Sequence, residues 1–215
     1  MNRAAVASVL LLAFVFLSQS TSSAQQKDKN VPQTTGALTR TTTRHEARRF
    51  GYGSSLTIVG APAGSITIEA WQKSEVDITA DIELHADTDA DLALLATINN
   101  FTLDEDANHL RILTTGTHDK IFMRRVAKKF PKTLLNLPWK IDYHIRVPAQ
   151  CDIEIDAGHG PVNLSGVEGA ISLKALQSDA VLTLTGGAVR VTIGGGSVNV
   201  IDAIALQPFM SITVS

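Results

Sequence analysis

The densest group of charged residues in the sequence is a basic segment between Lys120 and Lys132. It holds six positive charges, at Lys120, Arg124, Arg125, Lys128, Lys129 and Lys132. Phe122, Val126 and Phe130 recur at every fourth position, which predicts a short basic amphipathic helix. Such a helix can bind an anionic lipid, an envelope polysaccharide or an acidic partner. The alternative is a solvated connection whose aromatic rings only pack on the domain.

Two groups of carboxylates also have a spacing that could do chemistry. Asp87, Asp89 and Asp91 resemble the start of a calcium loop, but Leu92 and Ile98 occupy the positions where an EF-hand needs Gly and Glu. We therefore expect these carboxylates at the N-terminus of a helix, where negative charge is favourable.

The second group alternates along one face of a predicted strand: Asp152, Glu154 and Asp156. Enzymes that cut polysaccharides need two carboxylates from different strands, about 5–10 Å apart. Alternation along a single strand is also what any solvated strand face shows, so catalysis here is a minor alternative.

No other motif predicts catalysis, a cofactor or a metal. The six histidines, at positions 45, 85, 109, 118, 144 and 159, lack metal-ligand spacing. A serine-hydrolase elbow, a phosphate-binding loop and a dinucleotide-binding glycine pattern are all absent from the sequence. The glycines at 194–196 do not complete a calcium-binding nonapeptide. We therefore predict a protein that is not an enzyme and that uses no cofactor.

The elements that would position these residues follow a repeat between Ile153 and Val200. Pairs of aliphatic residues, with one residue between the two members, recur at short and nearly regular intervals separated by glycines. This period predicts short strands that stack on one another, and two units would make one coil of roughly 18–20 residues. The expected fold is all-β, a β-solenoid-like stack with N-terminal strands and one short helix; an antiparallel meander is the alternative. The pairs are Ile153/Ile155, Val162/Leu164, Ile171/Leu173, Leu182/Leu184, Val191/Ile193 and Val198/Val200.

Alternating apolar residues before the repeat predict further strands. They run through 56–58, 66–68, 76–84 and 141–147, with a hairpin between 101–103 and 110–113. Residues 60–64 (GAPAG) are expected to form a turn. A helix is expected after Asp87 or Thr88, with Leu92, Leu95 and Ile98 on its apolar face.

The N-terminal sequence predicts export. Arg3 precedes a 14-residue apolar run, Ala4 to Leu17, and small residues end at Ala24, as in a signal peptide occupying residues 1–24. The run is short for a membrane span of about 20 residues, although a retained anchor helix is the alternative. Residues 25–44 are polar and predict a disordered linker, so residues 45–215 would form a single β domain.

Charge and cysteine content restrict the partners. Without residues 1–24 the chain has 18 basic and 21 acidic residues, a net charge of −3, which argues against nucleic-acid binding. The single cysteine, Cys151, excludes an intramolecular disulfide. We expect it to be a small buried residue, and intermolecular pairing is the alternative.

Two stretches resemble a known bacterial family. Residues 64–71 (GSITIEAW) followed by 75–78 (EVDI), and residues 143–148 (YHIRVP) followed by 160–171 (GPVNLSGVEGAI), resemble motifs of the DUF4097 family of putative adhesins. The resemblance covers roughly Leu56 to Val200 and implies an exported, mostly β, solenoid-like domain without assigned catalytic residues. The chain departs from the pattern at 200–215, which leaves open whether the coil is complete or is closed by an atypical cap.

Together these features predict an exported, non-enzymatic cell-surface or envelope protein, an adhesin-like scaffold located in the periplasm, on the outer surface or outside the cell. The alternative is a module that binds anionic envelope polymers or lipid, as a peripheral membrane or polysaccharide contact, through residues 120–132. A polysaccharide-active β-helix enzyme is the third reading. The surface or envelope partner and the oligomeric state cannot be read from the sequence.

Overall fold

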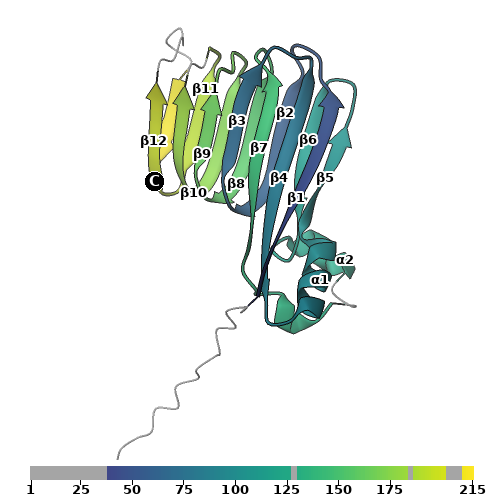
Figure 1. The fold of residues 1–215 in the computed structure, drawn as a ribbon. Helices are drawn as coiled ribbons and strands as arrows, with labels where there is room; N and C mark the ends of the chain where they lie inside the picture. The colour runs from purple at the N-terminus through teal and green to yellow at the C-terminus, as the bar shows by residue number, and fades with distance from the viewer. Residues whose placement is uncertain (1–37, 127–129, 184–185, 202–209) are drawn as a thin grey trace, which may run out of the picture. The chain divides into compact units, whose positions relative to one another are not determined.

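The computed structural model describes residues 38–126, 130–183, 186–201 and 210–215 (Figure 1). They form a mostly β fold in which 13 strands make one continuous curled sheet. Strand β10 (Ile171–Thr183) crosses from one half of this sheet to the other, because its first half pairs with different strands from its second half. We call the two halves sheet A and sheet B.

Sheet A begins with a long antiparallel group. β1 (Leu38–Arg49) pairs with β4 (Glu75–Ala86), and β4 pairs with β7 (Trp139–Pro148). Parallel strands continue the sheet from β7: β3 (Ile66–Trp71), β9 (Val162–Ser165), the second half of β10, and β12 (Gly196–Ile201). The strand predictions at 66–68, 76–84 and 141–147 are confirmed.

Sheet B begins with the predicted hairpin, β5 (Asn100–Glu105) and β6 (His109–Thr115). Parallel strands then follow in the order β2 (Ser55–Ala63), β8 (Asp152–His159), the first half of β10, β11 (Val189–Ile193) and β13 (Met210–Val214).

The register of the parallel strands explains the repeat in the sequence. Ile171 pairs with Ile153 on one side and with Val189 on the other, and these two partners are equally far from it along the chain. Ala180 pairs with Val162 and Val198 at the same interval, which we call the repeat interval. Similar apolar residues therefore stack across neighbouring strands and face the core. The parallel pairing excludes an antiparallel meander for β8 to β13.

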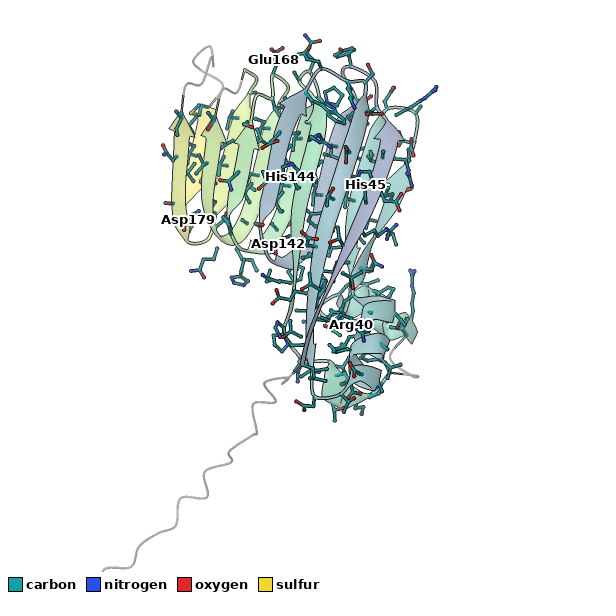
Figure 2. All side chains as sticks on the ribbon, in the orientation of Figure 1. Arg40, His45, Asp142, His144, Glu168 and Asp179 are labelled. Atoms are coloured by element: carbon teal, nitrogen blue, oxygen red, sulfur yellow. The ribbon has the colours of Figure 1, made fainter. Side chains whose placement is uncertain are left out.

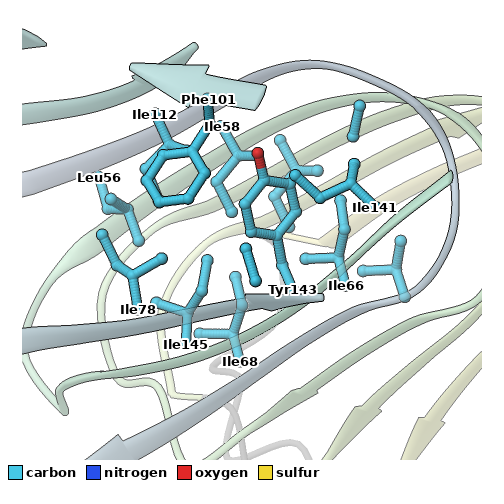
Figure 3. Packing of buried hydrophobic residues seen from close by; sticks show 14 of the residues in the cluster. Leu56, Ile58, Ile66, Ile68, Ile78, Phe101, Ile112, Ile141, Tyr143 and Ile145 are labelled. Carbon is cyan, nitrogen blue, oxygen red and sulfur yellow. The ribbon is translucent and has the colours of Figure 1, made fainter. Parts of the chain in front are cut away.

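The core lies between the two halves of the sheet (Figure 3). Rows of Ile, Leu and Val from both halves are almost fully buried, and burying each such side chain contributes about 1.5–3 kcal/mol. Two aromatic rings meet across the halves, Phe101 of β5 and Tyr143 of β7, edge to face with centroids 5.8 Å apart. The buried Tyr143 hydroxyl is 2.9 Å from Thr114 Oγ1 of β6.

Helix α1 (Asp89–Ile98) packs against β4 and β1. Thr88 caps it, since its side chain accepts a hydrogen bond from the Asp91 backbone N–H, and Asp89 and Asp91 lie in its first turn. Leu92, Leu95 and Ile98 are its buried residues. The helix prediction and the helix-terminus explanation of the acidic cluster are both confirmed.

Glycines make the corner between sheets B and A. Gly64, Gly160 and Gly196 have φ values of 118°, 136° and 112°, in the region that favours glycine. A Cβ at Gly160 would also collide with the backbone carbonyl of Gly64 on the adjacent chain segment. Backbones therefore stack too closely at this corner for most side chains.

Three boundary predictions are wrong, and the first concerns the linker. Residues 38–44 belong to β1. The inward positions of β1 include polar residues, Arg44, Glu46 and Arg48, opposite buried Ala80, Ile78 and Val76, so the strand has no apolar period. The rest of the predicted linker lies outside the described residues.

The second error is the turn expected at 60–64, because β2 continues to Ala63. Gly60, with φ of 82°, lies where the register between β2 and β8 shifts, and the change to sheet A follows at Gly64. The third concerns the repeat, since its third and fourth units belong to the single strand β10 rather than to two separate strands. Leu184, the last residue of the fourth pair, lies outside the described residues.

Candidate functional site

A groove of about 610 Å³ crosses the outer face of sheet B. It lies where β2, β8, β10, β11 and β13 begin, with His109 of β6 at one end. We call it the ladder groove, because its outward side chains occupy matching positions on successive parallel strands. Its central row is Thr57, Glu154, Ser172, Arg190 and Ser211.

The middle of the ladder groove is lined by small residues. Ala170, Ser172 and Ala188 lie there, on or just before β10 and β11. Glu154 and Arg190 lie on the strands to either side of β10 and are both exposed. Since neighbouring strands lie about 4.8 Å apart, their backbones are about 10 Å apart across Ser172.

The two charged groups of the central row, Glu154 and Arg190, have no ion-pair partner among the described residues. Their neighbours in the row are hydroxyl residues. A carboxylate and a guanidinium held apart in this way can bind an amine or hydroxyl at one side and an anionic group at the other.

Hydrogen bonds fix one end and the middle of the groove. Thr57 is buried, and its hydroxyl lies 2.8 Å from His109 Nε2 on the neighbouring strand. At the adjacent row the Asp152 carboxylate accepts a 2.7 Å hydrogen bond from the Ala170 N–H, which ties β8 to the start of β10. These contacts keep the groove in shape without a ligand.

The carboxylates of β8 do not meet a second carboxylate from another strand. Glu154 is opposite Thr57 and Ser172, and Asp156 is opposite Val59 and Lys174. Asp152 is opposite Ser55 on β2. The two-strand pair that glycoside hydrolysis needs is therefore not formed by Asp152, Glu154 and Asp156 with their neighbours on β2 and β10.

The outer face of sheet A also carries charged and histidine side chains, among them His45, Asp142 and His144 (Figure 2), and several of these are paired with one another. Asp77 contacts His45 Nε2 at 2.7 Å and Arg146 at 2.6 Å. Burial raises the pKa of the Asp77 carboxyl, but the hydrogen bond with His45 and the charge of Arg146 outweigh it and leave that pKa below its usual value.

The same pairing continues along sheet A. Lys140 bridges Glu83 and Asp142 at 3.2 and 3.4 Å. The Trp71 ring, a candidate platform for a sugar, is covered by Lys73 at 4.5 Å and Arg146 at 4.6 Å. These charges of sheet A are therefore already satisfied by one another.

The basic segment forms the predicted helix only in part. Helix α2 (Lys120–Val126) is seven residues long, and a short 3₁₀ turn follows at Lys132–Leu134. Met123 is its buried residue, while Phe122 and Val126 are half-buried. Lys120, Arg124, Arg125 and Lys132 are exposed; Lys128 and Lys129 lie outside the described residues.

An apolar residue stands among these charges. Ile121 is 69% exposed on α2, next to Lys120 and close in sequence to Arg124 and Arg125. A shallow hollow of about 440 Å³ lies on this part of the chain, lined by Lys120, Arg124 and Asn136 among others. Within the part of the chain that the structure describes, the four basic residues make no ion pair.

The remaining sequence candidates do not assemble into a site. No group of three or more His, Cys, Asp or Glu side chains among the described residues could hold a metal ion. His159 is exposed at the end of β8, as expected for a residue near a turn. In the described ranges no helix is long and apolar enough to cross a membrane, and residues 1–24 lie outside those ranges.

Cys151 is fully buried, as predicted from its place at the head of a strand. Burial, and secondarily the charge of Asp152, raise the pKa of its thiol to about 12. Intermolecular disulfide pairing would therefore require the folded chain to open.

Sequence reasoning missed the ladder groove. Its residues are single exposed positions in five strands, and only the pairing of those strands brings them into one row. Glu154 and Ser172 are separated by one repeat interval, as are Ser172 and Arg190, so the signal was present in the period of the repeat.

Comparisons with known proteins are limited. No family model matches the chain, and no curated protein matches its sequence. Among solved structures, one of a putative cell adhesion protein from Clostridium sporogenes is similar over 80% of this chain and 99% of that chain, with 9% identity and a TM-score of 0.40. A putative adhesin from Bacteroides fragilis shows 11% identity and a TM-score of 0.26 over 81% of this chain and 97% of that one.

A third structure, a putative lipid binding protein from Parabacteroides distasonis, has 8% identity and a TM-score of 0.22 over 80% of this chain and 96% of that one. Similarity at this level does not assign the chain to a family.

Proposed function

We propose that the chain is an exported, non-enzymatic protein of the cell envelope or cell surface, an adhesin-like scaffold that binds an extended polar partner along the ladder groove. The observation that carries this proposal is the row Glu154, Ser172 and Arg190, in which two charges without ion-pair partners among the described residues flank a hydroxyl. Both charged side chains are exposed, so leaving them unpaired costs little free energy. The support for the proposal is that they are aligned on either side of Ser172.

The scaffold is a β-solenoid in this proposal. Strands β8 to β13 support it, because they pair in parallel and their core residues recur at one repeat interval. Each coil places one outward residue at a fixed spacing of about 4.8 Å from the next. A rigid ladder binds without ordering its own backbone, which reduces the entropic cost of association.

The partner proposed for the groove is a glycan of the envelope or of another cell. Its hydroxyls would bind to Ser172, Ser211 and the carboxylate of Glu154, and an acidic or phosphorylated substituent would bind to Arg190. The enzyme reading is not proposed, since Asp152, Glu154 and Asp156 face no carboxylate on the neighbouring strands.

A glycan array with the chain from residue 25 onward tests this function. We expect binding to a subset of acidic glycans, and at least a tenfold loss of affinity in Glu154→Gln and Arg190→Gln. Glu168→Gln is the matched control, because Glu168 is an exposed glutamate outside the groove. Equal binding by all variants, or no binding at all, would contradict the proposal.

Localisation is tested separately by fractionation of the native protein. We expect it in the envelope or the medium, with residues 1–24 removed. A cytoplasmic pool that keeps its N-terminus would contradict export and leave the groove experiment unaffected.

A second function is favoured by the exposed Ile121 within the basic segment. We propose that α2 and the residues after it contact an anionic lipid or polymer surface, with Ile121 entering the interface and Lys120, Arg124, Arg125 and Lys132 on its charged side.

Sedimentation with vesicles that contain anionic lipid tests this contact. Replacing Arg124, Arg125, Lys128 and Lys129 by glutamine is expected to abolish co-sedimentation at physiological salt. The control removes four charges elsewhere, at Arg49, Lys73, Lys140 and Lys174. Unchanged sedimentation of the first variant, or equal loss in both, would refute a specific role for the segment.

A further inference from the structure

The two ends of the strand stack differ sharply in chemistry. At one end the edge strands are β1 and β5, and charged residues cover them. Arg44 stacks on the Phe101 ring at 4.2 Å and donates hydrogen bonds to the Phe101 carbonyl at 2.6 Å and to Asn100 Oδ1 at 3.0 Å. Glu46 binds both Arg44 and Arg48, at 2.8 and 2.9 Å. This end is closed and charged.

The opposite end consists of β12 in sheet A and β13 in sheet B. Among the described residues each pairs with a strand on one side only, β12 with β10 and β13 with β11. Neither strand contains a charged residue: their sequences are GSVNVI and MSITV. Natural edge strands usually carry charges, prolines or bulges that prevent further pairing, and these two lack all three devices.

The core is also exposed at this end. Ile212 and Val214 continue the core rows of Val191 and Ile193, whose side chains are fully buried. Yet Ile212 is 42% exposed and Val214 is 48% exposed. Among the described residues no strand lies on the far side of β13, whereas every preceding strand of sheet B is covered by the next along the same rows, so Ile212 and Val214 are left exposed.

We propose that a second copy of this chain covers this end, with β13 pairing antiparallel to β13 and β12 to β12 about a two-fold axis. A symmetric contact places neutral edges against neutral edges and lets Ile212 and Val214 of the two copies bury one another. A head-to-tail contact would instead place the neutral edges against the charged β1 and β5, where Arg48, Glu105 and Asp104 lie. The chemistry of the two ends therefore favours a closed dimer over a filament.

We choose a second copy as the partner because the uncharged edge strands of two copies match each other. A strand that covers β13 must supply an apolar inward row and no charge at the junction, and β13 itself meets both conditions. The inference rests on other side chains of β13 than the function proposed for the ladder groove, because Met210 and Ser211 line that groove while Ile212 and Val214 do not.

Sedimentation velocity of the chain from residue 25 onward, across 1–200 µM, tests the proposal. We expect a concentration-dependent dimer. Ile212→Lys and Ile212→Glu should each weaken dimerisation by at least about 100-fold, because like charges then face one another near the axis. An equimolar mixture of the two variants should dimerise again, since opposite charges are paired.

Two measurements keep the result interpretable. Leu176→Lys is the matched control, because Leu176 is 66% exposed at the corner of β10 and away from both edges; it should dimerise as the wild type does. Circular dichroism melts verify that the variants are folded. A wild type that stays monomeric at 200 µM, larger open-ended assemblies, or dimers that Ile212→Lys does not affect would each overturn the proposal.

Discussion

The buried thiol of Cys151 predicts a specific loss of stability at alkaline pH. The thiol has an ordinary pKa of 9.0, and burial raises its pKa to about 12 in the folded chain. Between these values the unfolded chain releases a proton that the folded chain keeps. Stability that is fully present below pH 9 is therefore lost as the pH rises, and the loss levels off above pH 12.

The magnitude follows from one titrating group. With about 1.36 kcal/mol for each pKa unit, the loss is about 1.4 kcal/mol at pH 10 and about 2.7 kcal/mol at pH 11. Tyr143, whose pKa burial also raises, adds to the loss in any variant that keeps it. A difference between the wild type and Cys151→Ala removes that shared contribution.

The assay is urea unfolding followed by the fluorescence of Trp71 and Trp139 at pH 7, 8, 9, 10 and 10.5. Below pH 8 the two proteins should differ by a constant free energy, the cost of the cavity left by the sulfur. That difference should shrink by about 1.4 kcal/mol at pH 10. Cys151→Val serves as a second variant that fills the space.

A difference that stays constant from pH 7 to pH 10.5 in both variants would refute the reasoning, because it would mean that the thiol ionises equally in the folded and unfolded chains. Labelling provides an independent check. A thiol reagent should react with the native protein only at the rate of its unfolding, and rapid labelling without denaturant would show that Cys151 is accessible.

Three further predictions concern stability and use urea unfolding at pH 7. Gly160→Ala should cost about 2–3 kcal/mol or more, because Gly160 combines a φ of 136° with a backbone collision. Gly53→Ala, with a φ of 73° and open space, should cost only about 1 kcal/mol, and equal costs would contradict the stacked corner. Tyr143→Phe should cost about 1–2 kcal/mol by leaving the buried Thr114 hydroxyl without its partner, and Thr114→Val should cost a similar amount, because it leaves the buried Tyr143 hydroxyl without its own. Strict additivity of these two changes in the double variant would mean that the hydrogen bond adds nothing. Arg44→Lys should cost about 1–2 kcal/mol and Arg49→Lys almost nothing, since Arg44 alone of the two stacks on Phe101 and donates to β5. Indistinguishable lysine variants would show that Arg44 does not close the charged end.

Much of the fold could be predicted because burial alternates along most strands. Ile153 and Ile155, or Val76 and Ile78, face the core with polar residues between them, and α1 has an Asp-rich first turn after a threonine cap. β1 could not be predicted, since its inward positions include Arg44, Glu46 and Arg48. The partners of Arg44, which are Asn100 and Phe101, lie far from it in sequence, so no local pattern connects them.

The candidate site could be predicted only in part, because a groove depends on which strands become neighbours. The basic segment at 120–132 is contiguous and was visible in the sequence, as was the alternation of Asp152, Glu154 and Asp156. Arg190 was a single exposed residue until parallel pairing placed it two strands from Glu154. Glu154 and Arg190 are two repeat intervals apart, so aligning the outward residues of the repeat, as the apolar pairs were aligned, would have connected them.

The distribution of ion pairs favours sheet B over sheet A for the binding that we propose. On sheet A the Asp77 carboxylate already contacts His45 and the Arg146 guanidinium, so a ligand there would have to break existing contacts before forming its own. On sheet B, Glu154 and Arg190 require no such exchange, because no ion pair joins either of them to another described residue. A binding partner therefore gains more from each contact at the ladder groove. Sheet A instead holds the longest antiparallel strands together, and its paired charges make it the surface on which substitutions should affect stability more than binding.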